Sequence, residues 1–461
     1  MTLIKSISGI RGTIGGKPNN NLTPIDIVES TAAYGSWLIS NFKNEKIKVV
    51  IGRDARISGQ MVENLCIGTL QSLGIDVVNL GLSTTPTVEI AVPMEKAHGG
   101  IILTASHNPK EWNALKLLNN KGEFISAEDG QLLLEIIKEN DFNFCNVDNI
   151  GNVTEDQTYF TKHIEEILKI NKVDINAIKN ANLRVVVDAV NSTGGMVLPQ
   201  LLKSLGCFEV IELYCNPTGE FPHNPEPLPE HLTELSKTVI QTKAHLGIVV
   251  DPDVDRLAFV CEDGSMFGEE YTLVAVADHV LKKEKGNTVS NLSSTRALRD
   301  VTESHGCKYN ASAVGEVNVV ELMKKTNAII GGEGNGGIIF PELHYGRDAL
   351  IGIALFLTHF ANENKKMSEL KNSYPNYTIS KNKIQLTPDI DTDKILNTLA
   401  SKYKDQPQIN IDGLKIELGN EWVHLRKSNT EPIIRIYSES NSKSKAHELG
   451  NRFIDEINAL T

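Results

Sequence analysis

One unit of strand, loop and helix recurs three times along the chain, and this repeat limits the possible folds more than any other feature. Its copies begin at residues 47–59 (IKVVIGRDARISG), 183–195 (LRVVVDAVNSTGG) and 288–296 (TVSNLSSTR). Each copy predicts a strand, which runs into a polar loop. A helix-like run follows and ends in a Ser-x-Gly turn, since glycine commonly terminates helices. The three turns start at Ser72, Ser204 and Ser304.

The second half of the unit repeats as well. Residues 96–101 read KAHGGI, residues 243–248 read KAHLGI, and a looser copy, NAIIGG, occupies residues 327–332. Strands that alternate with helices predict α/β layers with largely parallel sheets, in which ligands bind beyond the carboxyl ends of the strands. The loops TASHNP, DPDVD and EGNGG follow these strands, so we expect them to face a common cleft.

The last ~90 residues follow a different pattern, because residues 374–386 and 413–440 alternate apolar and polar side chains as half-buried antiparallel strands do. We therefore predict three similar α/β repeat domains plus a C-terminal α+β domain around a central active-site cleft. The connection to the last domain is expected at residues 362–366 and the roughly ten residues after them. The predicted domains are residues 1–153, 154–255, 256–368 and 369–461.

Composition and charge indicate a soluble protein. Of the 461 residues, 40% are hydrophobic and 23% are charged, which is typical of a globular chain with a sizeable core. The sequence has no run near the ~18 apolar residues of a membrane span and no signal peptide, so we expect a cytoplasmic protein without a membrane partner. The net charge is −12 and basic residues form no block, so nucleic acid is not an expected partner.

The six cysteines are spaced without a C-x-x-C motif, and we expect reduced, mostly buried thiols rather than disulfides or zinc ligands. They are Cys66, Cys145, Cys207, Cys215, Cys261 and Cys307.

The motif DPDVDR directly follows an apolar strand and places Asp251, Asp253 and Asp255 at alternate positions. Carboxylates gathered in this way favour a hard cation such as Mg²⁺, which suits phosphate chemistry. An EF-hand is a poor alternative, although Glu262 stands at the twelfth position, because the sixth position requires glycine and is Arg256. A solvated acidic cluster is the other alternative.

The loop TASHNP offers a candidate nucleophile, Ser106, with His107 beside it and Lys116 ten residues further on. A free serine is a weak nucleophile, so beside a divalent metal it makes more sense as a phosphate carrier. The alternative is that Ser106 only caps a turn and His107 is structural.

Three further segments carry binding groups. GGEGNGG (331–337) combines Glu333 and Asn335, which could bind sugar hydroxyls, with glycines that let a ligand approach the backbone. RKSNTEPIIR (426–435) combines arginines, hydroxyls and loop amides, as a phosphate site does. ISGIRG (7–12) adds Arg11. A solvated hairpin tip would also explain the second segment.

Together the motifs TASHNP, DPDVDR, GEGNG and RKSNTEPxxR occur in the order that resembles the α-D-phosphohexomutase superfamily, over the whole chain. The resemblance implies that Ser106 becomes a phosphoserine and that Mg²⁺ binds its phosphate together with Asp251, Asp253 and Asp255. It implies Lys116 as a general acid or base, with His107, Arg11 and Arg256 beside the reacting groups. It implies that Glu333 and Asn335 hold the sugar. The residues implied to hold the non-reacting phosphate are Arg426, Ser428, Asn429, Thr430 and Arg435.

The reaction implied by the resemblance is reversible phosphoryl transfer between the 1- and 6-positions of a hexose phosphate, with a hexose 1,6-bisphosphate as intermediate and activator. Asn335 stands where many members have serine, which favours phosphoglucosamine mutase; phosphomannomutase/phosphoglucomutase is the alternative. We expect a phosphosugar substrate and a monomer or homodimer.

Two other functions compete. A haloacid-dehalogenase-like phosphatase would use Asp251 as its nucleophile and leave Ser106 dispensable. A non-catalytic phosphosugar-binding protein would have damaged motifs, whereas Ser106, the three aspartates and Arg435 are intact.

Overall fold

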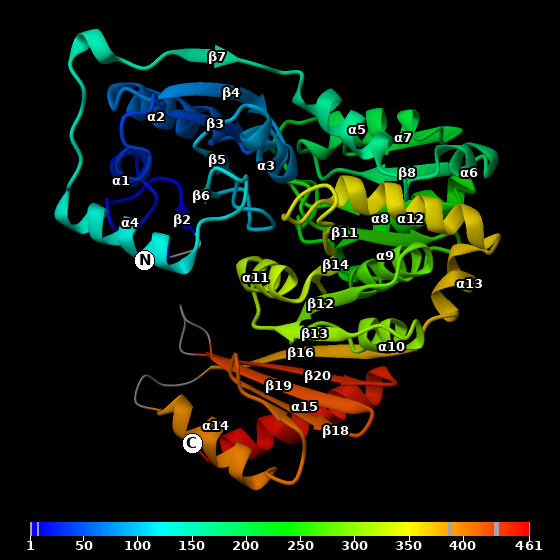
Figure 1. The fold of residues 1–461 in the computed structure, drawn as a ribbon. Coiled ribbons are helices and arrows are strands. Elements are labelled where there is room, and N and C mark those ends of the chain that lie inside the picture. The colour runs from blue at the N-terminus through cyan, green and yellow to red at the C-terminus, as the bar shows by residue number, and fades with distance from the viewer. Residues whose placement is uncertain (1, 7–8, 386–389, 428–432, 461) are drawn as a thin grey trace. The chain divides into compact units, whose positions relative to one another are not determined.

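The computed structural model describes residues 2–6, 9–385, 390–427 and 433–460 (Figure 1). The chain divides into two compact units, which we describe separately. The first comprises the residues up to 272 together with 336–368, and the second comprises 273–335 and the residues from 369 onward.

The first repeat forms the centre of a seven-stranded sheet in the first unit. Strand β3 lies between β4 and β5, and all three are parallel, as predicted. Strand β6 (Trp112–Leu118) runs antiparallel to β5, and β2 (Gly9–Thr13) runs antiparallel to β6. The sheet ends in β1 (Ile4–Ser6) on one side and β7 (Val153–Glu155) on the other. The repeat itself consists of β3 (Lys48–Arg53), α2 (Gly59–Ser72), β4 (Asp76–Leu82), α3 (Thr85–Met94) and β5 (Gly99–Leu103).

The second repeat forms a four-stranded sheet, also in the first unit. Strand β8 lies between its parallel neighbours β9 and β10, and β11 (Leu257–Cys261) runs antiparallel to β10. Helices α5 (Tyr159–Lys169) and α6 (Ile175–Asn180) precede it, and both pack against α12 (Ala349–Glu363). The repeat consists of β8 (Arg184–Asp188), α7 (Gly194–Ser204), β9 (Glu209–Leu213), α8 (Thr233–Thr242) and β10 (Leu246–Val250).

The third repeat has the same strand order, because β12 lies between β13 and β14 and all three are parallel. It follows α9 (Glu269–Lys283). Its elements are β12 (Asn287–Asn291), α10 (Ala297–Ser304), β13 (Tyr309–Ser312), α11 (Glu316–Thr326) and β14 (Ala328–Glu333). The predicted threefold α/β repeat is therefore confirmed.

The apolar runs and glycine turns explain why each repeat folds in this way. Strands β5 and β10 are buried along their whole length, and each fully buried Val, Ile or Leu side chain contributes about 1.5–3 kcal/mol. Helices α2, α7 and α10 end at the serines of the predicted turns. The glycines of these turns have φ values of 79°, 87° and 71° at Gly74, Gly206 and Gly306, which favour glycine because it lacks a Cβ atom.

The C-terminal domain is a five-stranded antiparallel sheet in the order β16-β20-β19-β18-β17, as the alternating pattern predicts. Its core joins one face of the sheet to helices α14 and α15. The segment expected to connect to this domain contains the short helix α13 (Met367–Asn372). The elements are β16 (Thr378–Gln385), α14 (Thr392–Lys402), β17 (Gln408–Ile409), β18 (Leu414–Leu418), β19 (Glu421–Lys427), β20 (Ile433–Ser440) and α15 (Lys443–Asn458).

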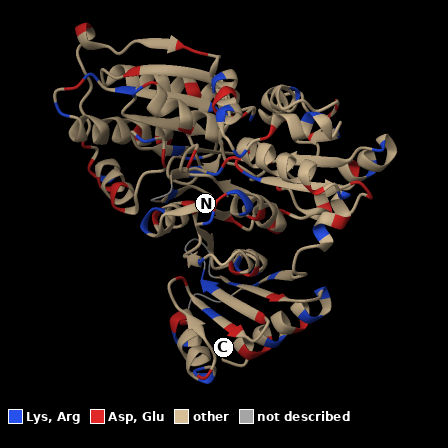
Figure 2. Cartoon of the chain, turned by 45° about the vertical axis from the view of Figure 1, so that its right-hand side comes forward, with Lys and Arg blue, Asp and Glu red and all other residues tan. Residues whose placement is uncertain are grey.

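Three further properties concern the whole chain. All six cysteines are free, but only Cys66 and Cys261 are buried, so the expectation of mostly buried thiols is wrong. In the described part of the chain, no helix is both long and apolar enough to cross a membrane. Basic and acidic residues are interspersed over the elements (Figure 2).

Helix α1 (Pro24–Asn41) fastens two strands that lead into the site. The fully buried hydroxyl of Tyr34 donates to the carbonyls of Leu118 (2.6 Å) and Gly100 (3.1 Å), which lie on β6 and β5. Tyr34→Phe leaves both carbonyls short of a donor, so we expect the free energy of unfolding to fall by about 1–3 kcal/mol. Thermal and urea unfolding would measure this, with the half-buried Tyr437→Phe as a control; an unchanged midpoint for Tyr34→Phe would contradict it.

Candidate active site

Three carboxylates meet directly after the buried strand β10. Asp251, Asp253 and Asp255 are each at most 1% exposed, and each offers one oxygen within 4.8 Å of the others. The loop turns tightly because Val254 has a φ of 64°. The predicted convergence of the three aspartates is thus present in the structure.

Hydrogen bonds from the protein hold at least one oxygen of each carboxylate. Asp251 Oδ1 accepts from the amides of Asp255 (3.2 Å) and Arg256 (3.1 Å). Asp253 Oδ2 accepts from Thr85 Oγ1 (2.5 Å) and Lys116 Nζ (2.7 Å).

Two carboxylate oxygens remain without a hydrogen bond. Neither Asp253 Oδ1 nor Asp255 Oδ1 has a hydrogen-bond partner among the described residues, although both atoms are buried. Buried polar oxygens normally have partners, and oxygen ligands are those that Mg²⁺ prefers. The three aspartates therefore fit a small hard cation. The two oxygens without a hydrogen bond, Asp253 Oδ1 and Asp255 Oδ1, are the ones that would bind it. Glu262 does not form an EF-hand ligand, because its carboxylate accepts from the amide and hydroxyl of Ser368.

Burial and the neighbouring charges shift the pKa values of Asp251 and Asp255 in opposite directions. Burial raises the pKa of Asp251 well above its ordinary value, and the neighbouring carboxylates of Asp255 and Asp253 raise it further. Burial also acts on Asp255, but the cations Arg347, Lys116 and Arg256 outweigh it and lower the pKa of Asp255. A divalent cation would relieve the repulsion that raises the pKa of Asp251.

Ser106 lies against this cluster. Its Oγ donates to Asp251 Oδ2 (2.6 Å), and Oγ and His107 Nδ1 are 3.4 Å apart. Ser106 is 8% exposed and has a φ of 50°, a left-handed conformation that few non-glycine residues adopt. Its amide donates to Thr104 Oγ1 (2.9 Å), which helps to hold that conformation.

Three cationic or ionisable side chains lie beside the serine or the carboxylates. Lys116 Nζ lies 2.7 Å from Asp253 and 3.4 Å from Asp255, and these carboxylates outweigh burial and raise the pKa of Lys116. Lys116 is thus a cation that can donate a proton but cannot accept one in this state. Burial and the Arg256 cation lower the pKa of His107, so its imidazole is neutral at neutral pH. Arg256 Nη1 donates to Glu226 Oε1 (3.0 Å).

Arg347 and Arg11 complete this part of the site. Arg347 Nη2 donates to Asp255 Oδ2 (2.7 Å), a contact that the sequence did not predict. Arg11 is exposed on β2 and pairs with Ala114 of β6. Since alternate residues of a strand face the same side, Arg11 lies on the same face of the sheet as Lys116.

The loop after the first strand of each repeat braces the loop after its third strand. In the second repeat, Ser192 Oγ (2.7 Å) and Thr193 Oγ1 (3.0 Å) both donate to the carbonyl of Pro252. In the third, Asn291 Nδ2 donates to Glu333 Oε1 (2.7 Å) and Ser294 Oγ accepts from the amide of Gly334 (2.8 Å). The parallel pairing of the first and third strands brings these loops to one edge of the sheet.

In the second unit, the predicted sugar-binding residues lie at the end of β14. Glu333 is 5% exposed, and its Oε1 also accepts from the amide of Gly315 (3.1 Å). Asn335 is half-buried.

The predicted phosphate-binding arginines face each other in the C-terminal sheet. Arg426 of β19 pairs directly with Arg435 of β20, and Arg435 pairs with Lys383 of β16. Like charges directly opposite each other are unfavourable, so this row of three cations fits an anion site. Lys383 was not predicted, and Arg426 Nη1 also contacts Asp412 Oδ2 (3.3 Å). The predicted ligands Ser428, Asn429 and Thr430 lie outside the described residues.

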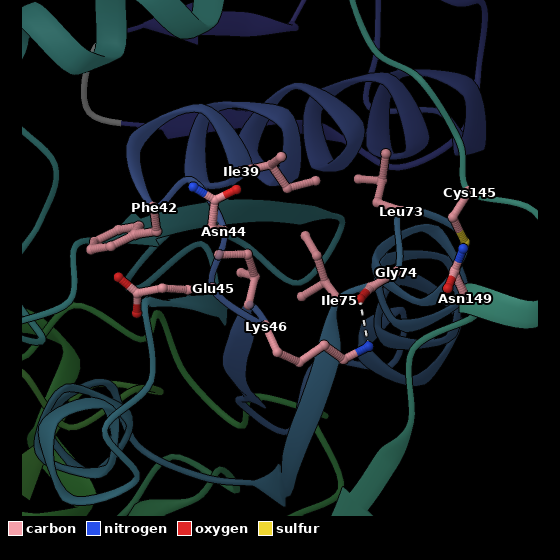
Figure 3. A pocket seen from close by; sticks show the side chains of 11 residues that line it. Ile39, Phe42, Asn44, Glu45, Lys46, Leu73, Gly74, Ile75, Cys145 and Asn149 are labelled. Carbon is pink, nitrogen blue, oxygen red and sulfur yellow. Dashed lines mark hydrogen bonds between the residues drawn. The ribbon is translucent and has the colours of Figure 1, made fainter.

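A separate cavity of about 290 Å³ lies beside the end of α1 (Figure 3). Apolar side chains such as Ile39, Leu73 and Ile75 line it, and Lys46 Nζ donates to the carbonyl of Gly74 (2.9 Å). None of its lining residues belongs to the serine loop or to the acidic cluster.

Comparisons with known proteins agree with this architecture. Models of the phosphoglucomutase/phosphomannomutase family match the chain in order: α/β/α domain I at residues 3–144, domain II at 159–264, domain III at 268–377 and the C-terminal domain at 385–456.

Two curated relatives and one solved structure extend over almost the whole chain. A phosphoglucomutase/phosphomannomutase of Thermococcus kodakarensis is 36% identical and covers 96% of this chain and 98% of its own. A probable phosphoglucosamine mutase of Methanopyrus kandleri is 34% identical, covering 98% and 96%. The crystal structure of a phosphoglucomutase/phosphomannomutase family protein from Burkholderia thailandensis has a TM-score of 0.86 at 26% identity, covering 99% and 97%.

The fold and these comparisons define an isomerase that moves a phosphoryl group within a phosphorylated hexose. The chain belongs to the phosphoglucomutase/phosphomannomutase family. The predicted resemblance to the α-D-phosphohexomutase superfamily is confirmed. The matches do not support the alternative of a haloacid-dehalogenase-like phosphatase.

Proposed function

We propose that the enzyme interconverts the 1- and 6-phosphates of a hexose through a phosphorylated Ser106 and a hexose 1,6-bisphosphate, with glucosamine phosphate as the preferred substrate. The hydrogen bond of 2.6 Å between Ser106 Oγ and Asp251 carries this proposal. It supports a serine that exchanges phosphoryl groups beside a metal site, because no other hydroxyl of the serine loop contacts the acidic cluster among the described residues.

In the first half-reaction, the bond between phosphorus and Ser106 Oγ breaks while a bond forms between phosphorus and a hydroxyl oxygen of the sugar phosphate. The hydroxyl proton leaves to a base, and Ser106 Oγ takes up a proton at the end of the step. Lys116, a cation that contacts Asp253, would supply that proton or balance the charge on the transferring group. The bisphosphate then returns its other phosphoryl group to Ser106.

Asp251, Asp253 and Asp255 would hold Mg²⁺, together with an oxygen of the phosphorylated Ser106. Bound there, the ion would neutralise charge on the phosphoryl oxygens during transfer. Arg347 and Lys116 hold Asp255 and Asp253 in place by their ion pairs, so the carboxylates are oriented before any ligand arrives.

The remaining contacts of the substrate are assigned to the second unit. Glu333 and Asn335 are proposed to bind sugar hydroxyls, and Arg426 and Arg435 to bind the non-reacting phosphate. Preorganisation supports this assignment, since Glu333 is held by two donors and the two arginines face each other across adjacent strands.

The preference for an amino sugar follows from Asn335 and from the relative of Methanopyrus kandleri that is named a probable phosphoglucosamine mutase. The relative of Thermococcus kodakarensis, named a phosphoglucomutase/phosphomannomutase, supports the second candidate, a mutase for mannose and glucose phosphates.

Side-by-side kinetics would separate the two candidates. We expect kcat/KM for glucosamine phosphate to exceed the values for mannose and glucose phosphates by at least about tenfold, the range that one well-placed polar contact provides. Asn335→Ser should reduce this ratio, while the exposed Asn397→Ser should not change it. Comparable values of kcat/KM for all three sugars would favour the second candidate.

A further inference from the structure

The serine loop depends on a residue that contacts neither the acidic cluster nor Ser106 Oγ. Arg56 follows strand β3, and the residue is 1% exposed. Its position corresponds to that of the bracing loops in the other two repeats, because β3 and β5 are adjacent parallel strands.

Arg56 binds the serine loop through four backbone carbonyls. Its Nη2 donates to the carbonyls of Ser106 (2.5 Å) and Asn108 (2.7 Å), and its Nη1 donates to those of Pro109 (2.7 Å) and Trp112 (3.0 Å). The fifth donor, Nε, is bound by Asp54 Oδ2 (3.0 Å). All five N–H groups of the guanidinium are therefore used, which a lysine with three donors cannot reproduce.

Asp54 also binds the serine loop, through the hydroxyl of Thr104. Its Oδ2 also accepts from Thr104 Oγ1 (2.7 Å), and Thr104 Oγ1 in turn accepts from the amide of Ser106 (2.9 Å). Ser106 is thus held on both sides, with its carbonyl on Arg56 and its amide on Thr104. The ring of Phe221 lies 5.1 Å from the guanidinium carbon of Arg56 and covers it.

We propose that Arg56, oriented by Asp54, is the positioning residue that keeps Ser106 in its left-handed conformation with Oγ directed at the acidic cluster. The inference rests on the proposed role of Ser106 as the phosphoryl carrier. It extends that role by naming the side chain that fixes the reacting geometry in both half-reactions, when the serine carries a phosphoryl group and when it does not.

Arg56→Lys tests the proposal because it keeps the positive charge and removes at least two of the five donors. A displacement of about 1 Å at a reacting group can lower the rate by roughly 100-fold. We expect kcat, counted per phosphorylated enzyme, to fall by roughly 10- to 100-fold while KM changes little. Amide hydrogen exchange at residues 104–112 should become faster.

Arg53→Lys is the matched control. Arg53 ends the same strand, but its side chain binds Glu63, Gln60 and the carbonyl of Asp54 rather than the serine loop. We expect its kcat and KM to remain within about twofold of the wild type, the usual range for a substitution away from the reacting groups. If Arg56→Lys is insoluble, Thr104→Val removes the other connection and should lower kcat in the same way.

Three outcomes distinguish the positioning role of Arg56 from the proposed role of Ser106 as the phosphoryl carrier. A fall of kcat in Arg56→Lys or Thr104→Val, but not in Arg53→Lys, supports the positioning role. A wild-type kcat in both loop variants, together with an inactive Ser106→Ala, overturns this role and leaves the proposed function intact. An active Ser106→Ala overturns both.

Discussion

Ser106→Ala is expected to lower kcat by at least about 1,000-fold, the scale seen when an enzyme loses its nucleophile. Alanine has no oxygen to carry the phosphoryl group, so both half-reactions stop. The protein should still fold, because the variant loses one hydrogen bond to Asp251 while the two amides bonded to Asp251 Oδ1 remain. Such a loss costs about 1 kcal/mol of unfolding free energy.

The measurement combines steady-state kinetics with mass spectrometry of the peptide that contains Ser106. The wild type incubated with hexose 1,6-bisphosphate should gain the mass of one phosphoryl group on this peptide, and Ser106→Ala should not. Ser83→Ala is a matched control, since Ser83 is a buried serine of the same domain whose hydroxyl has no hydrogen-bond partner among the described residues. Mutase activity within a few-fold of the wild type in Ser106→Ala would rule out the phosphoserine.

The sequence predicts the repeat and the chemistry loops because both depend on local patterns. Apolar runs, helix-ending glycines and polar residues placed directly after a strand are all readable within about ten residues. The loops of Ser106 and Asp251 follow β5 and β10 in the structure, as that reasoning requires.

The supporting residues could not be predicted in this way, because their contacts depend on which strands become neighbours. Thr85 and Arg347 are 168 and 92 residues away from the aspartates that they bind. Arg56 is 50 residues from Ser106. Its only signal in the sequence is its place in the loop after the first strand of a repeat, a loop whose counterparts also act as braces.

The register of the C-terminal sheet is another feature that the sequence leaves open. RKSNTEPIIR gives both arginines, but their direct pairing follows only from the alignment of β19 with β20. The pairing of Lys383 with Arg435 depends likewise on β16, about fifty residues earlier in the chain.

Asp253→Asn should lower kcat/KM by about 100-fold at a fixed Mg²⁺ concentration and raise the half-saturating Mg²⁺ concentration at least about tenfold. The substitution removes one of three negative charges and replaces the unbonded Oδ1 or its partner oxygen with an amide group. Thr85 and Lys116 keep an acceptor only if the remaining amide oxygen faces them, so the variant cannot satisfy both these donors and the cation.

Without Mg²⁺, the thermal stability of Asp253→Asn is not expected to fall as its activity does. This difference distinguishes a metal site from a structural acid cluster. Without Mg²⁺, the loss of one charge relieves the repulsion that raises the pKa of Asp251, so Asp253→Asn should unfold at the same temperature as the wild type or a higher one. With saturating Mg²⁺, the melting temperature of the wild type should rise, because a ligand bound only to the folded state stabilises it, and that of the variant should not.

Thermal unfolding and activity, each measured over a series of Mg²⁺ concentrations, would test both statements. Asp263→Asn is the control, since the exposed Asp263 accepts from the amide and hydroxyl of Ser265 in a turn outside the cluster. We expect this control to show the wild-type response to Mg²⁺. An Asp253→Asn variant with the same Mg²⁺ dependence as the wild type would refute the assignment of Asp253 as a ligand; a variant destabilised equally with and without Mg²⁺ would instead mean that Asp253 serves mainly to hold Thr85 and Lys116.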